Sequence, residues 1–159
     1  MRSTQRPSTQ DFLIRLPAGQ SEAGRLSRLG DVEPVAGSRD LLLHLREPSD
    51  EPRTIWRQIV TELGPGSMAS PVLVDELGQA HLPTGEISVR FHTEPSDEAL
   101  RQFAARHGLA VRERNKYVPR QVCFEPSESS YLPDLVQELA PSKEVETVWA
   151  NTLSRFRRV

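Results

Sequence analysis

The 159-residue chain has few of the features that accompany secretion or membrane insertion. It contains one cysteine, Cys123, so no disulfide can form within the chain. No apolar run approaches the ~18 residues that a membrane-spanning helix requires. The first ten residues are polar and have none of the apolar character of a secretory signal. We therefore expect an intracellular, cytoplasmic protein without a membrane partner.

The chain also lacks a large excess of positive or negative charge, and it has few aromatic residues. The 20 Lys and Arg residues against 22 Asp and Glu residues give a formal net charge of −2. Aromatic residues make up 6% of the chain, and the strand-like run at 120–127 holds Phe124 as its single aromatic. RNA-recognition sheets stack bases on several such residues. The sequence thus predicts no nucleic-acid partner, and a nucleic-acid alternative would depend on the basic residues of 112–120 and of the C-terminus.

Motifs that carry catalysis are missing. The sequence has no G-x-S-x-G, H-E-x-x-H, C-x-x-C or P-loop pattern. Its four histidines fall in separate predicted elements, without the spacing of metal ligands: His44, His81, His92 and His107. We expect a protein that is not an enzyme and that holds neither a metal nor a cofactor.

The second half of the chain has a clear succession of elements. Ile87, Val89 and Phe91 alternate with polar residues, as in a strand with one buried face. Helical patterns begin after Ser96 and near residue 132. The full order is strand 85–92, helix 96–108, strands 109–118 and 120–127, helix 132–142 and strand 145–151. This β-α-β-β-α-β order is typical of the ferredoxin-like motif, whose helices cover one sheet face and leave the other available to a partner.

The first half repeats that order. The expected elements are strand 11–16, helix 21–30, strands 32–35 and 41–45, helix 51–63 and strand 71–74. Gly30 and Gly108 take matching places as glycines that end the first helix of each half. We therefore predict an α+β fold of two tandem ferredoxin-like units with antiparallel sheets and helices on one face. The predicted organisation is a disordered leader (1–10), two units (11–80 and 84–151) and an extended tail (152–159).

Several stretches of the second half resemble one protein family. They are TGEISVRF, SDEALRQFAARHGLAV, DLVQELA and the closing VETVWAN. Together they are similar to the N-terminal propeptide of subtilisin-like serine proteases, in particular to fervidolysin-type prodomains. The resemblance covers about half of the chain. It implies a non-catalytic inhibitor and folding chaperone whose sheet face packs on the protease and whose C-terminal tail lies in the substrate cleft.

The resemblance assigns the protease-binding role to the end of the chain. Val159 would occupy the first specificity pocket and Phe156 the pocket for the residue three positions earlier. The predicted binding tail consists of Arg155, Phe156, Arg157, Arg158 and Val159. The tail holds no proline, so each of its main-chain N–H groups can be donated to a neighbouring strand.

Three further residues are candidates for the interface: Asn151, the outward-pointing Glu125, and Trp149, which is either a core residue or an interface anchor. The family's Pro-Asn pair stands here as Ala150-Asn151, and Trp149 and Ala150 replace the acidic residues found at this place in the best-known propeptides. The chain would act either in trans or as a prodomain of a longer protein. The alternative function is a regulatory or scaffold module whose paired units bind a small ligand or another protein.

Overall fold

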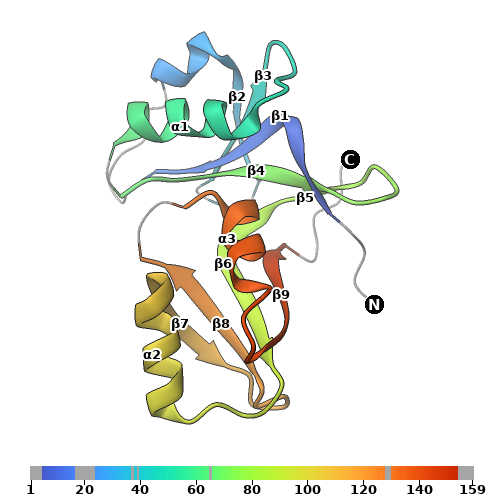
Figure 1. Ribbon diagram of the computed structural model, residues 1–159. Helices are drawn as coiled ribbons and strands as arrows, with labels where there is room; N and C mark the ends of the chain where they lie inside the picture. Colours follow the sequence, from blue (N-terminus) through green and yellow to red (C-terminus); the bar gives the residue numbers. More distant parts are fainter. Residues whose placement is uncertain are drawn as a thin grey trace. The chain divides into compact units, whose positions relative to one another are not determined.

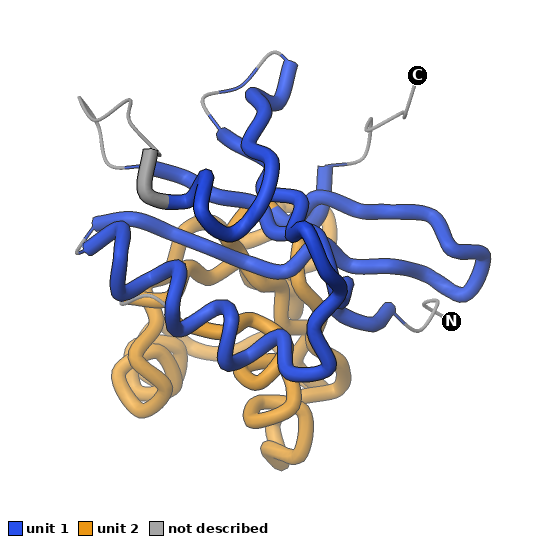
Figure 2. The backbone as a smooth tube through the Cα atoms, turned by 90° about the horizontal axis from the view of Figure 1, so that it is seen from above, with its two compact units in different colours: residues 1–83, 152–159 blue, residues 84–151 orange. Residues whose placement is uncertain are grey.

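The computed structural model describes residues 5–16, 24–36, 38, 40–64, 66–127 and 130–153. Within these ranges the protein is α+β, with two antiparallel sheets and three α-helices. The chain divides into two compact units (Figure 2). Unit 1 comprises Met1–Pro83 with Thr152–Val159, and unit 2 comprises Thr84–Asn151. The bounds of unit 2 coincide with the range 84–151 expected from the sequence.

Unit 1 is a five-stranded sheet with one α-helix and one 3₁₀ helix. Its elements are β1 (Arg6–Arg15), η1 (Gly24–Arg28), β2 (Gly30–Pro34), β3 (Leu41–Leu45), α1 (Pro52–Leu63), β4 (Met68–Val74) and β5 (Ala80–His81), in the sheet order β2-β3-β1-β4-β5 (Figure 1). Leu26 of η1 and Ile59 of α1 pack on Phe12 and Ile14 of β1. The two helical elements therefore share one sheet face. The opposite face is also buried at Leu13, which forms a second apolar cluster with two other buried residues, Val72 and Leu82.

The expectation of a disordered leader at residues 1–10 is wrong for its second half. Strand β1 begins at Arg6, which pairs with Val74 of β4. Ser8 is buried, and its hydroxyl accepts hydrogen bonds from the N–H groups of Gln10 and Asp11 at 3.1 and 3.0 Å. These bonds hold an irregularity of the strand between residues 7 and 12. Polar composition suggested disorder here, but pairing with β4 satisfies the backbone.

Gly30 and Gly108 have different roles, although the sequence placed both at helix ends. Gly108 follows α2 with φ 65° and ψ 41°, and its N–H donates to the Ala104 carbonyl. This is the left-handed conformation that favours glycine after a helix. Gly30 instead begins β2, where an added Cβ would lie 2.0 Å from the backbone oxygen of His44 on β3. Glycine is required there because the neighbouring strand leaves no room for a side chain.

Unit 2 is a four-stranded sheet with two α-helices. Its elements are β6 (Pro83–Phe91), α2 (Asp97–His107), β7 (Leu109–Arg114), β8 (Gln121–Pro126), α3 (Leu132–Leu139) and β9 (Val145–Thr152), in the sheet order β7-β8-β6-β9. Counting the strands within each unit, the second, third, first and fourth are neighbours in both sheets, and β5 is added in unit 1. The element order predicted for unit 2 is present in full.

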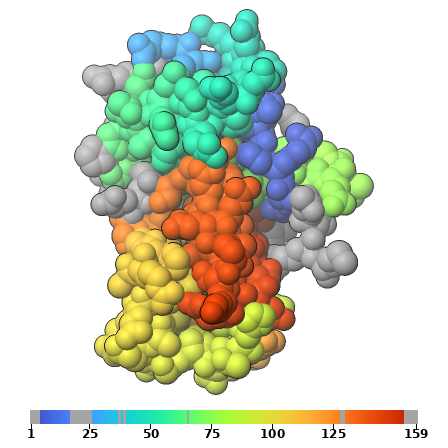
Figure 3. All heavy atoms as spheres, in the orientation of Figure 1, coloured from blue at the N-terminus to red at the C-terminus, as the bar shows by residue number. Residues whose placement is uncertain are grey.

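The core of unit 2 lies between one face of its sheet and both helices. Phe103 of α2 packs edge-on against Phe91 of β6 with ring centroids 5.1 Å apart, and its ring lies 5.5 Å from that of Phe124 on β8. Leu135 and Leu139 of α3 join the same cluster. Helices α2 and α3 thus cover the same sheet face (Figure 1), and their outer sides form molecular surface in Figure 3. Neither helix covers the other face of this sheet.

Candidate functional site

The face of the unit 2 sheet that neither α2 nor α3 covers is called the uncovered face. It is built from the polar residues that alternate with core residues along each strand. On β6, Ile87 and Val89 are fully buried among core residues, while Ser88 and Arg90 point the opposite way. The register pairs Ser88 with Cys123 and Arg90 with Gln121 on β8. Because partners in a sheet project to the same side, these side chains form aligned rows. Strand β9 flanks β6 on the side away from β8 and adds its own outward residues.

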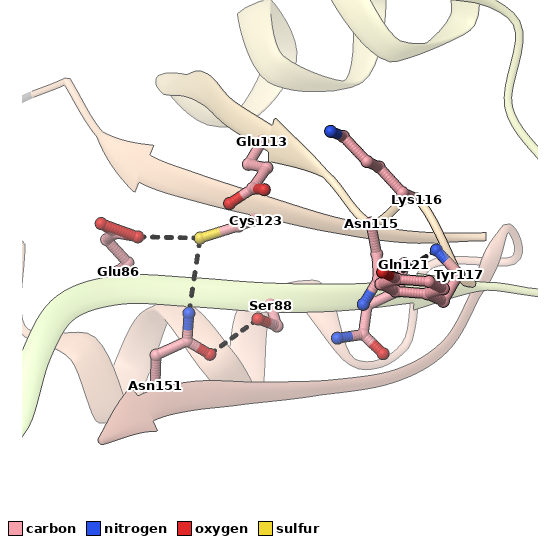
Figure 4. Close-up of a pocket in the computed structure, with 9 residues that line it drawn as sticks. All are labelled: Glu86, Ser88, Glu113, Asn115, Lys116, Tyr117, Gln121, Cys123 and Asn151. Carbon is pink, nitrogen blue, oxygen red and sulfur yellow. Dashed lines mark hydrogen bonds between the residues drawn. The ribbon is translucent and has the colours of Figure 1, made fainter. Parts of the chain in front are cut away.

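A chain of hydrogen bonds links three strands across this face (Figure 4). The Ser88 hydroxyl donates to Asn151 Oδ1 at 2.6 Å. Asn151 Nδ2 donates to Cys123 Sγ at 3.4 Å, and the Cys123 thiol donates to Glu86 Oε2 at 2.9 Å. Each donor points toward the next acceptor, and the series of hydrogen bonds ends on the carboxylate of Glu86. These hydrogen bonds therefore hold the side chains in place.

The thiol of Cys123 is kept protonated by its surroundings. Burial, the hydrogen bond to Glu86 and the negative charge of Glu86 raise the pKa of Cys123 to about 12. The charge of Glu113 acts in the same direction, and the bond from Asn151 opposes it. Since the thiolate is the nucleophilic form, Cys123 is a hydrogen-bonded structural residue near neutral pH.

The low reactivity of Cys123 can be measured by alkylation. A rise in pKa from 9.0 to about 12 lowers the thiolate fraction at pH 8 by roughly a thousandfold, and the more basic thiolate regains about twentyfold in nucleophilicity. We expect iodoacetamide to modify the native chain roughly fiftyfold more slowly than the urea-unfolded chain, as measured by mass spectrometry. Glu86→Gln should speed the native reaction, because it keeps an acceptor but removes the charge. Equal rates in native and unfolded chain would contradict the assignment.

The same raised pKa sets the sign of a pH effect on stability. The folded chain retains a proton that the unfolded chain releases above the ordinary pKa of 9.0. The contribution of Cys123 to stability is therefore complete below pH 9 and is lost as the pH rises toward about 12.

Trp149 and Arg90 form the second feature of the face. The Arg90 guanidinium carbon lies 5.8 Å from the centroid of the Trp149 ring, within the range of a cation–π contact. Arg90 Nη2 also donates to Gln121 Oε1 at 3.2 Å. Trp149 is partly exposed and stands on β9, two residues before Asn151. It therefore belongs to the uncovered face and lies outside the core cluster of unit 2.

A groove with a volume of about 570 Å³ opens on this face (Figure 4). Its strand residues are Glu86, Ser88, Glu113, Gln121, Cys123 and Asn151, and its remaining lining comes from Asn115, Lys116 and Tyr117 in the turn after β7. The lining is polar and includes two carboxylates. All of these residues belong to unit 2.

The predicted site residues fall in three different situations. Asn151 lines the groove, and Trp149 stands nearby on the same strand. Glu125 is exposed on β8, where it lies 3.6 Å from Arg112 Nε, and it is not part of the groove lining. The predicted tail, 155–159, lies outside the described residues. The last described residue is Leu153, whose N–H donates to the Leu82 carbonyl at 2.9 Å.

Sequence reasoning did not identify Glu86, Ser88 or Cys123 as members of a site. Their outward orientation follows from alternation along β6 and β8. Their proximity to Asn151 depends on β6 lying between β8 and β9, which no local pattern specifies.

No protein-family model, no curated protein and no solved structure matches the chain. Among the described residues, no three His, Cys, Asp or Glu side chains are grouped so that they could hold a metal ion. No helix in the described ranges has the length and apolar character needed to cross a membrane. The face thus carries a hydrogen-bonded polar network beside one large, partly exposed aromatic residue, Trp149.

Proposed function

We propose that this chain is a non-catalytic inhibitor and folding chaperone of a subtilisin-like serine protease. In this proposal both units are ferredoxin-like, and the uncovered sheet face of unit 2 binds the protease surface. The observation that carries the proposal is the face itself, which presents an ordered polar network beside the Arg90–Trp149 pair. The shared neighbour order of four strands in the two sheets supports the tandem ferredoxin-like assignment.

The composition of the face suits a protein partner. Tryptophan and arginine are enriched among the residues that contribute most to protein–protein binding. Trp149 and Arg90 are held by each other, and Arg90 is held further by Gln121. Ordered side chains lose little conformational entropy on binding, so more of the contact energy appears as affinity.

The tail supplies the second half of the proposed mechanism. Strand β9 ends at Thr152, and the predicted binding residues follow three positions later in the sequence. An extended segment that adds to a strand of the protease cleft gains main-chain hydrogen bonds and places alternate side chains in pockets. In the proposed complex, Phe156 and Val159 fill two pockets while Arg157 and Arg158 lie between them.

A regulatory or scaffold module is the second candidate. The groove favours it, because a lined volume of about 570 Å³ is within the range of small-ligand sites. This candidate predicts binding that does not depend on the tail. The protease proposal predicts that both the face and the tail contribute.

The face can be tested by Trp149→Ala in an inhibition assay with a subtilisin-like protease. Loss of an interfacial tryptophan removes at least about 2 kcal/mol, so we expect the inhibition constant to rise about thirtyfold. Arg101→Ala is the matched control, since Arg101 is exposed on α2, the helix side of unit 2. It should leave inhibition unchanged. Failure of the unaltered chain to inhibit any subtilisin-like protease would refute the proposal.

A further inference from the structure

The groove on unit 2 has an acidic end. Figure 4 shows the side chains of Glu86 and Glu113 on two sides of the Cys123 sulfur. Glu86 accepts the thiol hydrogen through Oε2. Within the described part of the chain, no arginine, lysine or histidine forms an ion pair with either carboxylate. The remaining carboxylate oxygens are therefore acceptors open to a ligand.

The internal network does not offset this charge. Ser88, Asn151 and Cys123 each donate one hydrogen bond to the next residue of a series that ends on Glu86. These three residues are neutral, and Cys123 stays protonated because of its burial, its hydrogen bond to Glu86 and the charge of Glu86. Lys116 is the cation of the lining, and it is exposed on the turn. A cationic ligand is thus the charge-complementary occupant of this end of the groove.

The rim of the groove carries an exposed aromatic ring on an ordered turn. Tyr117 is 94% exposed. Asn115 Oδ1 accepts hydrogen bonds from the N–H groups of Tyr117 at 2.8 Å and Val118 at 3.0 Å. The Gln121 N–H donates to the Val118 carbonyl at 2.9 Å, which closes the turn. The backbone of the turn is held by these bonds, and the exposed ring of Tyr117 offers contact area to a partner.

We propose that the groove receives an arginine side chain from an extended segment of the partner protein. The guanidinium would bind the carboxylates of Glu86 and Glu113, and the segment would lie against Tyr117. Arginine fits better than lysine, because its planar fork donates several hydrogen bonds in fixed directions to carboxylate oxygens. This inference rests on the proposed role of the same face in binding a protein, and it specifies the chemistry of the partner at one point.

The test uses the whole chain and three peptides, without any protease. Acetyl-Ala-Arg-Ala-amide is titrated against the ¹⁵N-labelled chain, with citrulline and lysine versions of the peptide in parallel. We expect the arginine peptide to shift the amide signals of Glu86, Glu113 and Tyr117. The citrulline peptide has the same shape without the charge and should bind at least about tenfold more weakly, the loss that accompanies one charge-assisted hydrogen bond.

Two variants test the named contacts. Glu113→Gln, at an exposed position, should weaken arginine binding about tenfold, and Tyr117→Ala about threefold. Glu98→Gln on α2 is the matched control and should change nothing, because Glu98 is an exposed glutamate of the helix side. Unchanged amide signals away from the groove verify that each variant is folded.

Three outcomes would overturn the inference: no shifts at the groove, equal binding of the citrulline or lysine peptide, or full binding by Glu113→Gln. The result is separable from the proposed function. A chain that binds the arginine peptide but inhibits no subtilisin-like protease would keep this inference and lose the other. A chain that inhibits through its tail but ignores arginine would do the reverse.

Discussion

Deletion of residues 155–159 is expected to weaken inhibition of a subtilisin-like protease by more than about 100-fold. The deleted segment would supply several main-chain hydrogen bonds of about 1 kcal/mol each and the apolar burial of Phe156 and Val159, about 1.5–3 kcal/mol per side chain. A net loss of about 3 kcal/mol already exceeds a hundredfold change in affinity. The measurement is the inhibition constant of the truncated chain against that of the full chain.

The truncated chain should be as stable as the full one. Strand β9 ends at Thr152, and the bond from Leu153 to Leu82 lies before the deletion. A second variant, Phe156→Ala, isolates one side chain and should account for a tenfold to hundredfold part of the loss. If the truncated chain inhibited as well as the full chain, the tail would have no part in the mechanism. The scaffold function would then be favoured.

Phe124→Ala is expected to destabilise unit 2 by about 3–5 kcal/mol, the usual effect of removing a buried phenylalanine ring. Phe124 is fully buried at the centre of the sheet. Its ring lies 5.5 Å from that of Phe103 and 6.4 Å from that of Phe91, so the change leaves a cavity bordered by two aromatic rings. Urea unfolding followed by the fluorescence of Trp149 reports on this unit, in a Trp56→Phe background that removes the tryptophan of unit 1.

Two control variants give this experiment its scale. Phe124→Leu keeps most of the apolar volume and should lose clearly less stability than Phe124→Ala. Val111→Ala on β7 changes a residue that is 40% exposed. Its free energy of unfolding should stay within about 0.5 kcal/mol of that of the unaltered chain. A loss below about 1 kcal/mol for Phe124→Ala would mean that the aromatic cluster does not stabilise unit 2.

Most of unit 2 was predictable from local patterns. Strict alternation around Ile87 and Val89 identified β6, and Ser96 identified the start of α2, where its hydroxyl accepts the Ala99 N–H at 3.1 Å. The elements of unit 1 agreed less closely with the local sequence patterns. Polar residues at the start of β1 do not alternate with apolar ones, so their pairing with β4 left no sign in the local sequence. Gly30 matched Gly108 by position, but its close contact with β3 depends on strand packing.

The sequence alone therefore determined the α+β class, the order of elements in unit 2 and which side chains of its strands face outward. Hydrophobic periodicity and helix-capping residues act over a few positions, so they can be recognised in the sequence alone. Only the tertiary structure decided that Glu86, Cys123 and Asn151 form one network, and that Glu113 and Tyr117 border the same groove. These residues are up to 65 positions apart in the sequence, between Glu86 and Asn151, and strand order alone brings them together.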